Sequence, residues 1–227
     1  DRSWDWADGD EQSVLNHVNT HRELQTKIGE VFLFWSSCAC PSLMGVYGEV
    51  GLEEFAYYLA DCPEIITRRL EYNTVRGLQM IEHLPEDAEV EAVFLGDDIA
   101  FKTGTLVSPQ WMRRHYFPLL KQVIDAYKHK NVKVLFHSDG NLMDILDDLV
   151  DAGVDGLNPL EVAAGMDVVE VRKNFPRLQI LGGIDKRPLA TGRNAIDVEL
   201  EARLPSMLPH GGYIPYVDHT VPSDVSW

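Results

Sequence analysis

Two histidines and two acidic residues lie just after apolar segments and are candidate metal ligands. His137 ends the apolar, β-branched run at residues 132–136, and Asp139 follows it by two residues. His219 and Glu161 come shortly after two other apolar runs. Imidazole nitrogens and carboxylate oxygens that converge on one face form a divalent metal site. We predict such a site from these four residues. Glu161 could instead be a general acid, and each of the four could instead have a structural role.

A second set of charged residues is predicted to contact a substrate. Asp97 and Asp98 are adjacent, so in an extended segment one should point inward while the other faces outward or caps a turn. Lys102 could pair with a substrate carboxylate or be solvated. Asp185 follows a glycine pair that permits close backbone approach to a ligand. We assign catalytic roles to Asp97, His137 and Glu161, and substrate binding to Asp98, Lys102 and Asp185.

These residues lie in a chain where short apolar runs alternate with helical periodicity. Ser108-Pro109 combines a hydroxyl cap with a proline, which predicts the start of a helix that continues through Tyr127. Pro63 is likewise suited to a first helical turn. The predicted strands are residues 31–35, 90–95, 132–136, 154–157, 178–181 and 213–217, and the predicted helices are 10–28, 51–59, 63–84, 108–127, 145–149, 168–173 and 196–208.

The alternation of strands and helices predicts an α/β fold with a parallel sheet. Nearly every predicted strand is followed by a polar or ionisable group, whereas an open doubly wound sheet concentrates its site at one switch point. We therefore predict a (β/α)8 TIM barrel that forms one domain over residues 1–227. About six strand–helix units are visible, so we expect the barrel to be incomplete at its N-terminus and C-terminus in this chain.

Charge and composition exclude several classes of partner. The chain has 20 basic and 36 acidic residues, a formal net charge of −16, which would repel nucleic acids and anionic membrane surfaces. No apolar run approaches the roughly 18 residues that span a bilayer, and no signal peptide opens the chain. We expect a cytoplasmic protein that acts on a small-molecule substrate, and we allow for a homodimer.

Several motifs occur in an order that resembles the uroporphyrinogen decarboxylase superfamily. They include the blocks 96–102, 136–141, 153–161 and 218–222, and the resemblance extends over most of the chain from about Val31. It implies a (β/α)8 barrel with one of two known activities. One branch decarboxylates a tetrapyrrole in haem biosynthesis without a cofactor. The other contains cobamide-dependent methyltransferases, which move methyl groups between corrinoid proteins and thiols or other acceptors, usually with zinc.

The 96–102 block and the block around His137 resemble the methyltransferase branch more closely. Thiol-using members of that branch bind zinc through a histidine, a cysteine two residues later and a late cysteine. Here the matching positions are His137, Asp139 and His219. These ligands donate less charge than thiolates, which makes a thiol a less suitable methyl acceptor.

The resemblance thus favours a methyltransferase that moves a methyl group between a small substrate and a corrinoid. Zinc would be the metal, and the corrinoid would be a co-substrate or would be carried by a partner protein. Two alternatives stay open. One is uroporphyrinogen decarboxylation, in which a carboxylate such as Asp97 would orient the macrocycle. The other is a non-catalytic scaffold that binds a corrinoid or tetrapyrrole.

Overall fold

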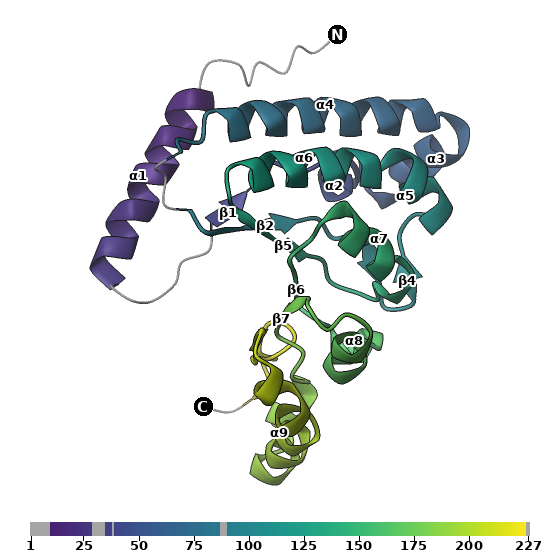
Figure 1. The fold of residues 1–227 in the computed structure, drawn as a ribbon. Helices are drawn as coiled ribbons and strands as arrows, with labels where there is room; N and C mark the ends of the chain where they lie inside the picture. The colour runs from purple at the N-terminus through teal and green to yellow at the C-terminus, as the bar shows by residue number, and fades with distance from the viewer. Residues whose placement is uncertain (1–9, 29–34, 38, 87–89, 226–227) are drawn as a thin grey trace. The chain divides into compact units, whose positions relative to one another are not determined.

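The computed structural model describes residues 10–28, 35–37, 39–86 and 90–225 (Figure 1). The chain divides into two compact units. The first falls within residues 1–96 and 115–134, and the second within residues 97–114 and 135–227. Within the described residues, none of the helices combines the length and apolarity needed to cross a bilayer.

The first unit is built around two amphipathic helices that pack side by side, α4 (Pro63–Glu82) and α6 (Phe117–His129) (Figure 1). Pro63 lies in the first turn of α4, where its missing N–H costs no hydrogen bond. Strand β1 (Trp35–Ser37) pairs in parallel with β2 (Ala92–Gly96). The remaining helices of this unit are α1 (Asp10–Ile28), α2 (Leu43–Val50) and α3 (Leu52–Asp61).

The second unit contains a run of parallel strands whose carboxyl ends share one edge. Strand β5 (Lys133–His137), whose last three residues fall in this unit, pairs with β6 (Gly156–Asn158). Next in order are β7 (Gln179–Leu181) and β8 (Tyr213–Ile214), each parallel to its neighbour. Parallel pairing places the residues that follow these strands along the same edge of the sheet.

Helices and short elements connect the strands of the second unit. A small antiparallel hairpin of β3 and β4 precedes α5, and three helices follow β5, β6 and β7. Because each of these helices presents buried apolar residues, the strands lie in a hydrophobic core. The elements are β3 (Ala100–Phe101), β4 (Gly104–Thr105), α5 (Pro109–His115), α7 (Leu146–Ala152), α8 (Val168–Asn174) and α9 (Arg193–Met207), with 3-10 turns at Met143–Ile145, Val162–Ala164, Arg187–Ala190 and Leu208–His210.

The structure confirms the α/β class with parallel strands and corrects several elements. The single helix predicted over 108–127 is wrong, because α5 and α6 are separate helices with Tyr116 between them. Pro118 explains the break: it has no N–H to donate, and inside a helix its ring would clash with the preceding turn. Helix α2 and the β3–β4 hairpin were not predicted. Most of the strand predicted at residues 31–35 lies outside the described residues.

Candidate metal centre

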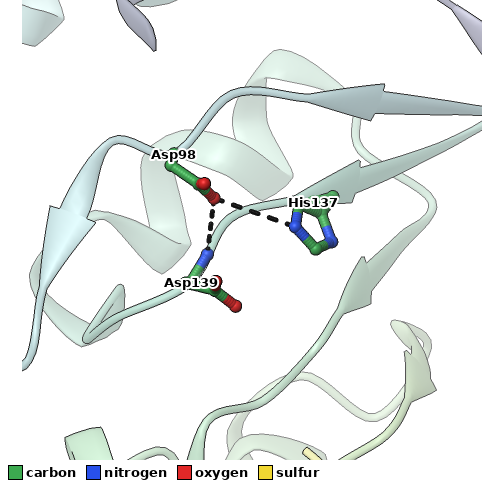
Figure 2. Close-up of side chains that lie close together, drawn as sticks. All are labelled: Asp98, His137 and Asp139. Carbon is green, nitrogen blue, oxygen red and sulfur yellow. Dashed lines mark hydrogen bonds and ion pairs between the residues drawn. The ribbon is translucent and has the colours of Figure 1, made fainter. Parts of the chain in front are cut away.

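Three side chains of the second unit bring potential metal ligands together. One ligand atom each from Asp98, His137 and Asp139 lies within 4.8 Å of the other two. Asp98 Oδ1 is 3.8 Å from His137 Nε2 and accepts a 2.9 Å hydrogen bond from the backbone N–H of Asp139. Figure 2 shows dashed lines from the Asp98 carboxylate to the imidazole ring and to that backbone nitrogen. We call these three residues the Asp98–His137–Asp139 group.

Strand pairing explains why residues 39 positions apart in sequence meet here. His137 is the last residue of β5, and its backbone carbonyl accepts a 2.9 Å hydrogen bond from the N–H of Asp97. That bond holds residues 97–98 beside the end of β5. Ser138, which is buried, adds a second tie, because its hydroxyl accepts a 3.1 Å bond from the N–H of Ile99. The site is therefore positioned by hydrogen bonds from the backbone N–H groups on either side of Asp98, and not only by contacts between the three ligand side chains.

Asn158 fixes the orientation of the His137 ring. It is the last residue of β6, it lies opposite His137 in the parallel register, and its Oδ1 is 2.7 Å from His137 Nδ1. An amide oxygen only accepts hydrogen bonds, so Nδ1 carries the proton and Nε2 keeps its lone pair. The lone pair lies on the side of Asp98 (Figure 2). This is the arrangement that a metal-binding histidine requires.

Asp139 has one carboxylate oxygen with a donor and one without. Its Oδ2 accepts a 3.1 Å bond from Nε2 of His219, whereas Oδ1 is buried and has no hydrogen-bond partner among the described residues. A buried anionic oxygen without a donor is costly, and a cation beside it would remove that cost. The donor set therefore fits a divalent ion such as zinc, with His219 supporting the Asp139 ligand from outside.

Glu161 lies next to this group but outside it. Its Oε2 accepts a 3.0 Å bond from the backbone N–H of Gly140, and its Oε1 is 3.9 Å from Nζ of Lys186. Gly140 adopts φ +87°, and a Cβ at this position would lie 2.7 Å from backbone atoms of Ala100. Only glycine fits this close approach, which lets the backbone at 140 reach the Glu161 carboxylate. Of the four predicted ligands, His137 and Asp139 are in the group, and His219 and Glu161 flank it.

The other predicted site residues differ in burial and surroundings. Asp97 is fully buried, whereas the Asp98 side chain is 35% exposed, as expected if adjacent residues face opposite sides. Lys102 is exposed in the β3–β4 turn. Asp185 is buried and accepts hydrogen bonds from the Arg187 guanidinium, which hold the pKa of Asp185 below its usual value. The substrate-binding roles of Lys102 and Asp185 stay predictions.

A comparison with known families identifies the chain's family. The profile described as Uroporphyrinogen decarboxylase (URO-D) matches residues 21–227. The chain belongs to the URO-D family. This confirms the resemblance inferred from the motifs, and the match includes described parts of both compact units. A comparison with curated proteins gives no significant match.

A solved structure shares the fold of this URO-D family chain. It is a methyltransferase from Methanosarcina mazei, which superposes with a TM-score of 0.68 at 17% sequence identity. The alignment covers 92% of this chain and 60% of the other, so the chain spans 60% of the length of the protein it matches. At this identity the likeness concerns the fold.

Three residues around the site of this URO-D family member were not assigned roles from sequence. Asn158 orients His137, Lys186 faces Glu161, and Asp218 is fully buried and accepts bonds from the backbone N–H groups of Val162 and Lys186. Asp98 was assigned to substrate binding, yet the structure places it in the ligand group. A signal was present for Asn158, because it is a polar residue at the end of an apolar run. Asp218 carried the same signal, because it directly follows the strand predicted at 213–217, whereas Lys186 had none.

Proposed function

We propose that this chain is part of a methyltransferase that moves a methyl group between a small substrate and a corrinoid with the help of a divalent metal. The Asp98–His137–Asp139 group carries the proposal, because it brings together an oriented imidazole and two carboxylates, and one oxygen of Asp139 has no donor among the described residues. Family membership and the fold shared with a methyltransferase support it. We further propose that the parallel strands belong to a (β/α)8 barrel.

Zinc is the metal we propose, held by Asp98, His137 and Asp139. When bound, zinc supplies Lewis acidity toward a substrate heteroatom. The two carboxylates balance its charge, while Asn158 keeps the proton of His137 on Nδ1. His219 donates its Nε2 proton to Asp139 and so fixes the direction of that carboxylate. A corrinoid, free or on a partner protein, would take or give the methyl group.

Glu161 is the group that we propose for protonating a leaving oxygen or nitrogen. Its carboxylate is three-quarters buried, it is held by the N–H of Gly140, and it faces the ammonium group of Lys186. A proton can therefore be exchanged at Glu161 without disturbing the three metal ligands. The position of Glu161 beside the Asp98–His137–Asp139 group, where it accepts a bond from the N–H of Gly140, supports this role.

The test combines metal analysis with a methyl-transfer assay. Purified protein is analysed for zinc, and methylcobalamin formation from cob(I)alamin is followed by absorbance with methoxylated aromatics, methylamines and methyl thioethers as donors. We expect about one zinc per chain and turnover with at least one donor. His137→Ala should lose both. The control is His129→Ala, which removes an exposed histidine whose Nδ1 bonds to the Asp125 carbonyl in α6. Metal-free protein, or unchanged turnover in His137→Ala, would overturn the proposal.

Tetrapyrrole decarboxylation is the second candidate, favoured by the partly exposed carboxylates of Asp98 and Asp139. Such carboxylates could accept hydrogen bonds from pyrrole N–H groups and orient a macrocycle. Conversion of uroporphyrinogen by zinc-free protein would select this activity over methyl transfer. Tight cobalamin binding without turnover of any donor would instead indicate a binding scaffold.

A further inference from the structure

We propose that Asp218 is a positioning residue that holds three loops of the site together. Its side chain is fully buried. Oδ2 accepts a 2.8 Å hydrogen bond from the N–H of Val162, and Oδ1 accepts a 3.2 Å bond from the N–H of Lys186. The N–H of Asp218 itself donates to the carbonyl of Ile184 at 2.8 Å. One carboxylate therefore joins the loops after β6 and β7 to its own loop after β8.

Each loop held by Asp218 delivers a side chain to the edge of the metal centre. Val162 directly follows Glu161, so the bond to Val162 fixes the backbone that carries the Glu161 carboxylate. Lys186 places its ammonium 3.9 Å from that carboxylate. His219 directly follows Asp218 and bonds to Oδ2 of Asp139. Asp218 touches none of the three proposed ligands, and it acts on Asp139 through His219.

The chemistry of the carboxylate suits this task. A buried carboxylate is tolerated only when donors surround it, and here each oxygen has a backbone donor from a different loop. An amide in its place keeps one acceptor oxygen and presents an NH2 group to the other backbone N–H. Substituting Asp218 by Asn therefore releases one of the two loops while the size of the side chain stays the same.

The matched control is Asp167, which also accepts two backbone N–H bonds in the same unit. Its Oδ1 caps α8 by accepting from Val169 and Glu170 at 2.8 and 3.1 Å. Both bonds stay within one helix, and Oδ2 of Asp167 accepts a bond from the guanidinium of Arg203 in α9. Asp167→Asn can keep both cap bonds on its amide oxygen and loses the ion pair with Arg203. Both variants therefore neutralise one carboxylate of the unit at constant size, but only Asp218→Asn frees a loop that carries Glu161, Lys186 or His219.

The experiment measures zinc affinity by competition with a chelator, the imidazole nitrogens of His219 by NMR, and the urea midpoint of unfolding. We expect Asp218→Asn to weaken zinc binding by about 10–100-fold, the range for loss of an outer partner of a metal site. The His219 spectrum should change from a single Nε2-protonated form to a mixture of forms. Asp167→Asn should lower the urea midpoint and leave zinc affinity and the His219 spectrum unchanged. Equal effects of the two variants on zinc binding would overturn the inference.

This inference rests on the proposed metal site, and two readouts separate their failures. If the wild-type protein binds no zinc, the proposed function fails. The His219 spectrum of the metal-free protein then still tests whether Asp218 positions the three loops. If Asp218→Asn does not fold, the inference is tested instead by amide hydrogen exchange of the wild-type protein. The amides of Val162 and Lys186 should then exchange slowly and at similar rates, because they share one buried acceptor residue. Fast exchange at either amide would overturn the inference that Asp218 holds the loops together.

Discussion

Two aspartates on neighbouring loops of the second unit have opposite surroundings. Asp218, after β8, is fully buried, and both of its oxygens accept backbone N–H bonds. Asp139, after β5, has one oxygen bonded to His219 and one buried oxygen that lacks a donor within the described part of the chain. The first carboxylate is committed to holding the fold. The second has an oxygen that can still accept a bond, and a metal ion could bind to it.

Asp185 extends the comparison to a third loop. Both of its oxygens accept bonds from the Arg187 guanidinium, and the pKa of Asp185 is accordingly lowered. It resembles Asp218 in having its oxygens occupied, although its partner is a charged side chain rather than the backbone. The number of occupied oxygens, and not the presence of an acidic residue after a strand, distinguishes the proposed ligand from the structural carboxylates.

Asp139→Asn gives the largest expected change in the comparison. It removes a proposed ligand charge while preserving size, so zinc affinity should fall by more than the roughly 10–100-fold that loss of an outer partner causes. The urea midpoint should stay the same or rise, because the variant removes an anionic oxygen that has no donor among the residues that the structure describes. Chelator competition and urea unfolding measure the two effects. Unchanged zinc affinity would show that the donor-less oxygen of Asp139 is not a metal ligand.

Asn158→Leu should have the next largest effect. It removes the acceptor that keeps the His137 proton on Nδ1, so the ring can turn or change tautomer. We expect zinc affinity to fall by about 10–100-fold, with no loss of any ligand atom. Asn158→Asp is the control, because it retains an acceptor oxygen and should keep the affinity. Equal losses in the two variants would mean that the hydrogen bond to His137 does not tune the site.

The sequence predicted the parts of this site that are local. His137 and Asp139 are two residues apart at the end of an apolar run, and the structure places both in the group. Adjacent aspartates at 97 and 98 indicated that one faces inward, but the pattern could not say which. Asp98 joins the group because the backbone at Asp97 bonds to the end of β5, a pairing that depends on the tertiary register.

The less predictable parts depend on distant loops. Asp218 bonds to backbone N–H groups that lie 32 and 56 residues earlier in the chain, so its role could not be inferred although it opens the 218–222 block. Lys186 acts through a contact with Glu161 on another loop, and no motif marks it. The strand ends were predictable because apolar runs of β-branched residues stop there. The helix break at Tyr116 was missed because the apolar periodicity continues through Pro118. Proline cannot donate a backbone hydrogen bond inside a helix but is tolerated in a first turn, so α5 ends before Pro118 and α6 begins with Pro118 in its first turn.

Tyr213→Phe is expected to have the smallest effect on stability and zinc binding. It tests whether a buried polar group that lacks a hydrogen-bond partner is functional for that reason alone. The Tyr213 hydroxyl in β8 is buried and has no hydrogen-bond partner in the residues that the structure describes. Unlike Asp139, it is neutral and belongs to no ligand group. Near neutral pH we expect the variant to be as stable as the wild type or about 1 kcal/mol more stable, and to bind zinc equally well.

The pH dependence of unfolding completes this test. Burial raises the pKa of Tyr213 to about 12, above its value of 10.0 in the unfolded chain. Ionisation of the hydroxyl therefore leaves the free energy of unfolding unchanged below about pH 10 and lowers it as the pH rises toward 12, because the unfolded state ionises first. The wild type should lose stability over this range more steeply than Tyr213→Phe in urea unfolding. A destabilised variant near neutral pH would mean that the hydroxyl has a bonding partner, and the parallel with Asp139 Oδ1 would then fail.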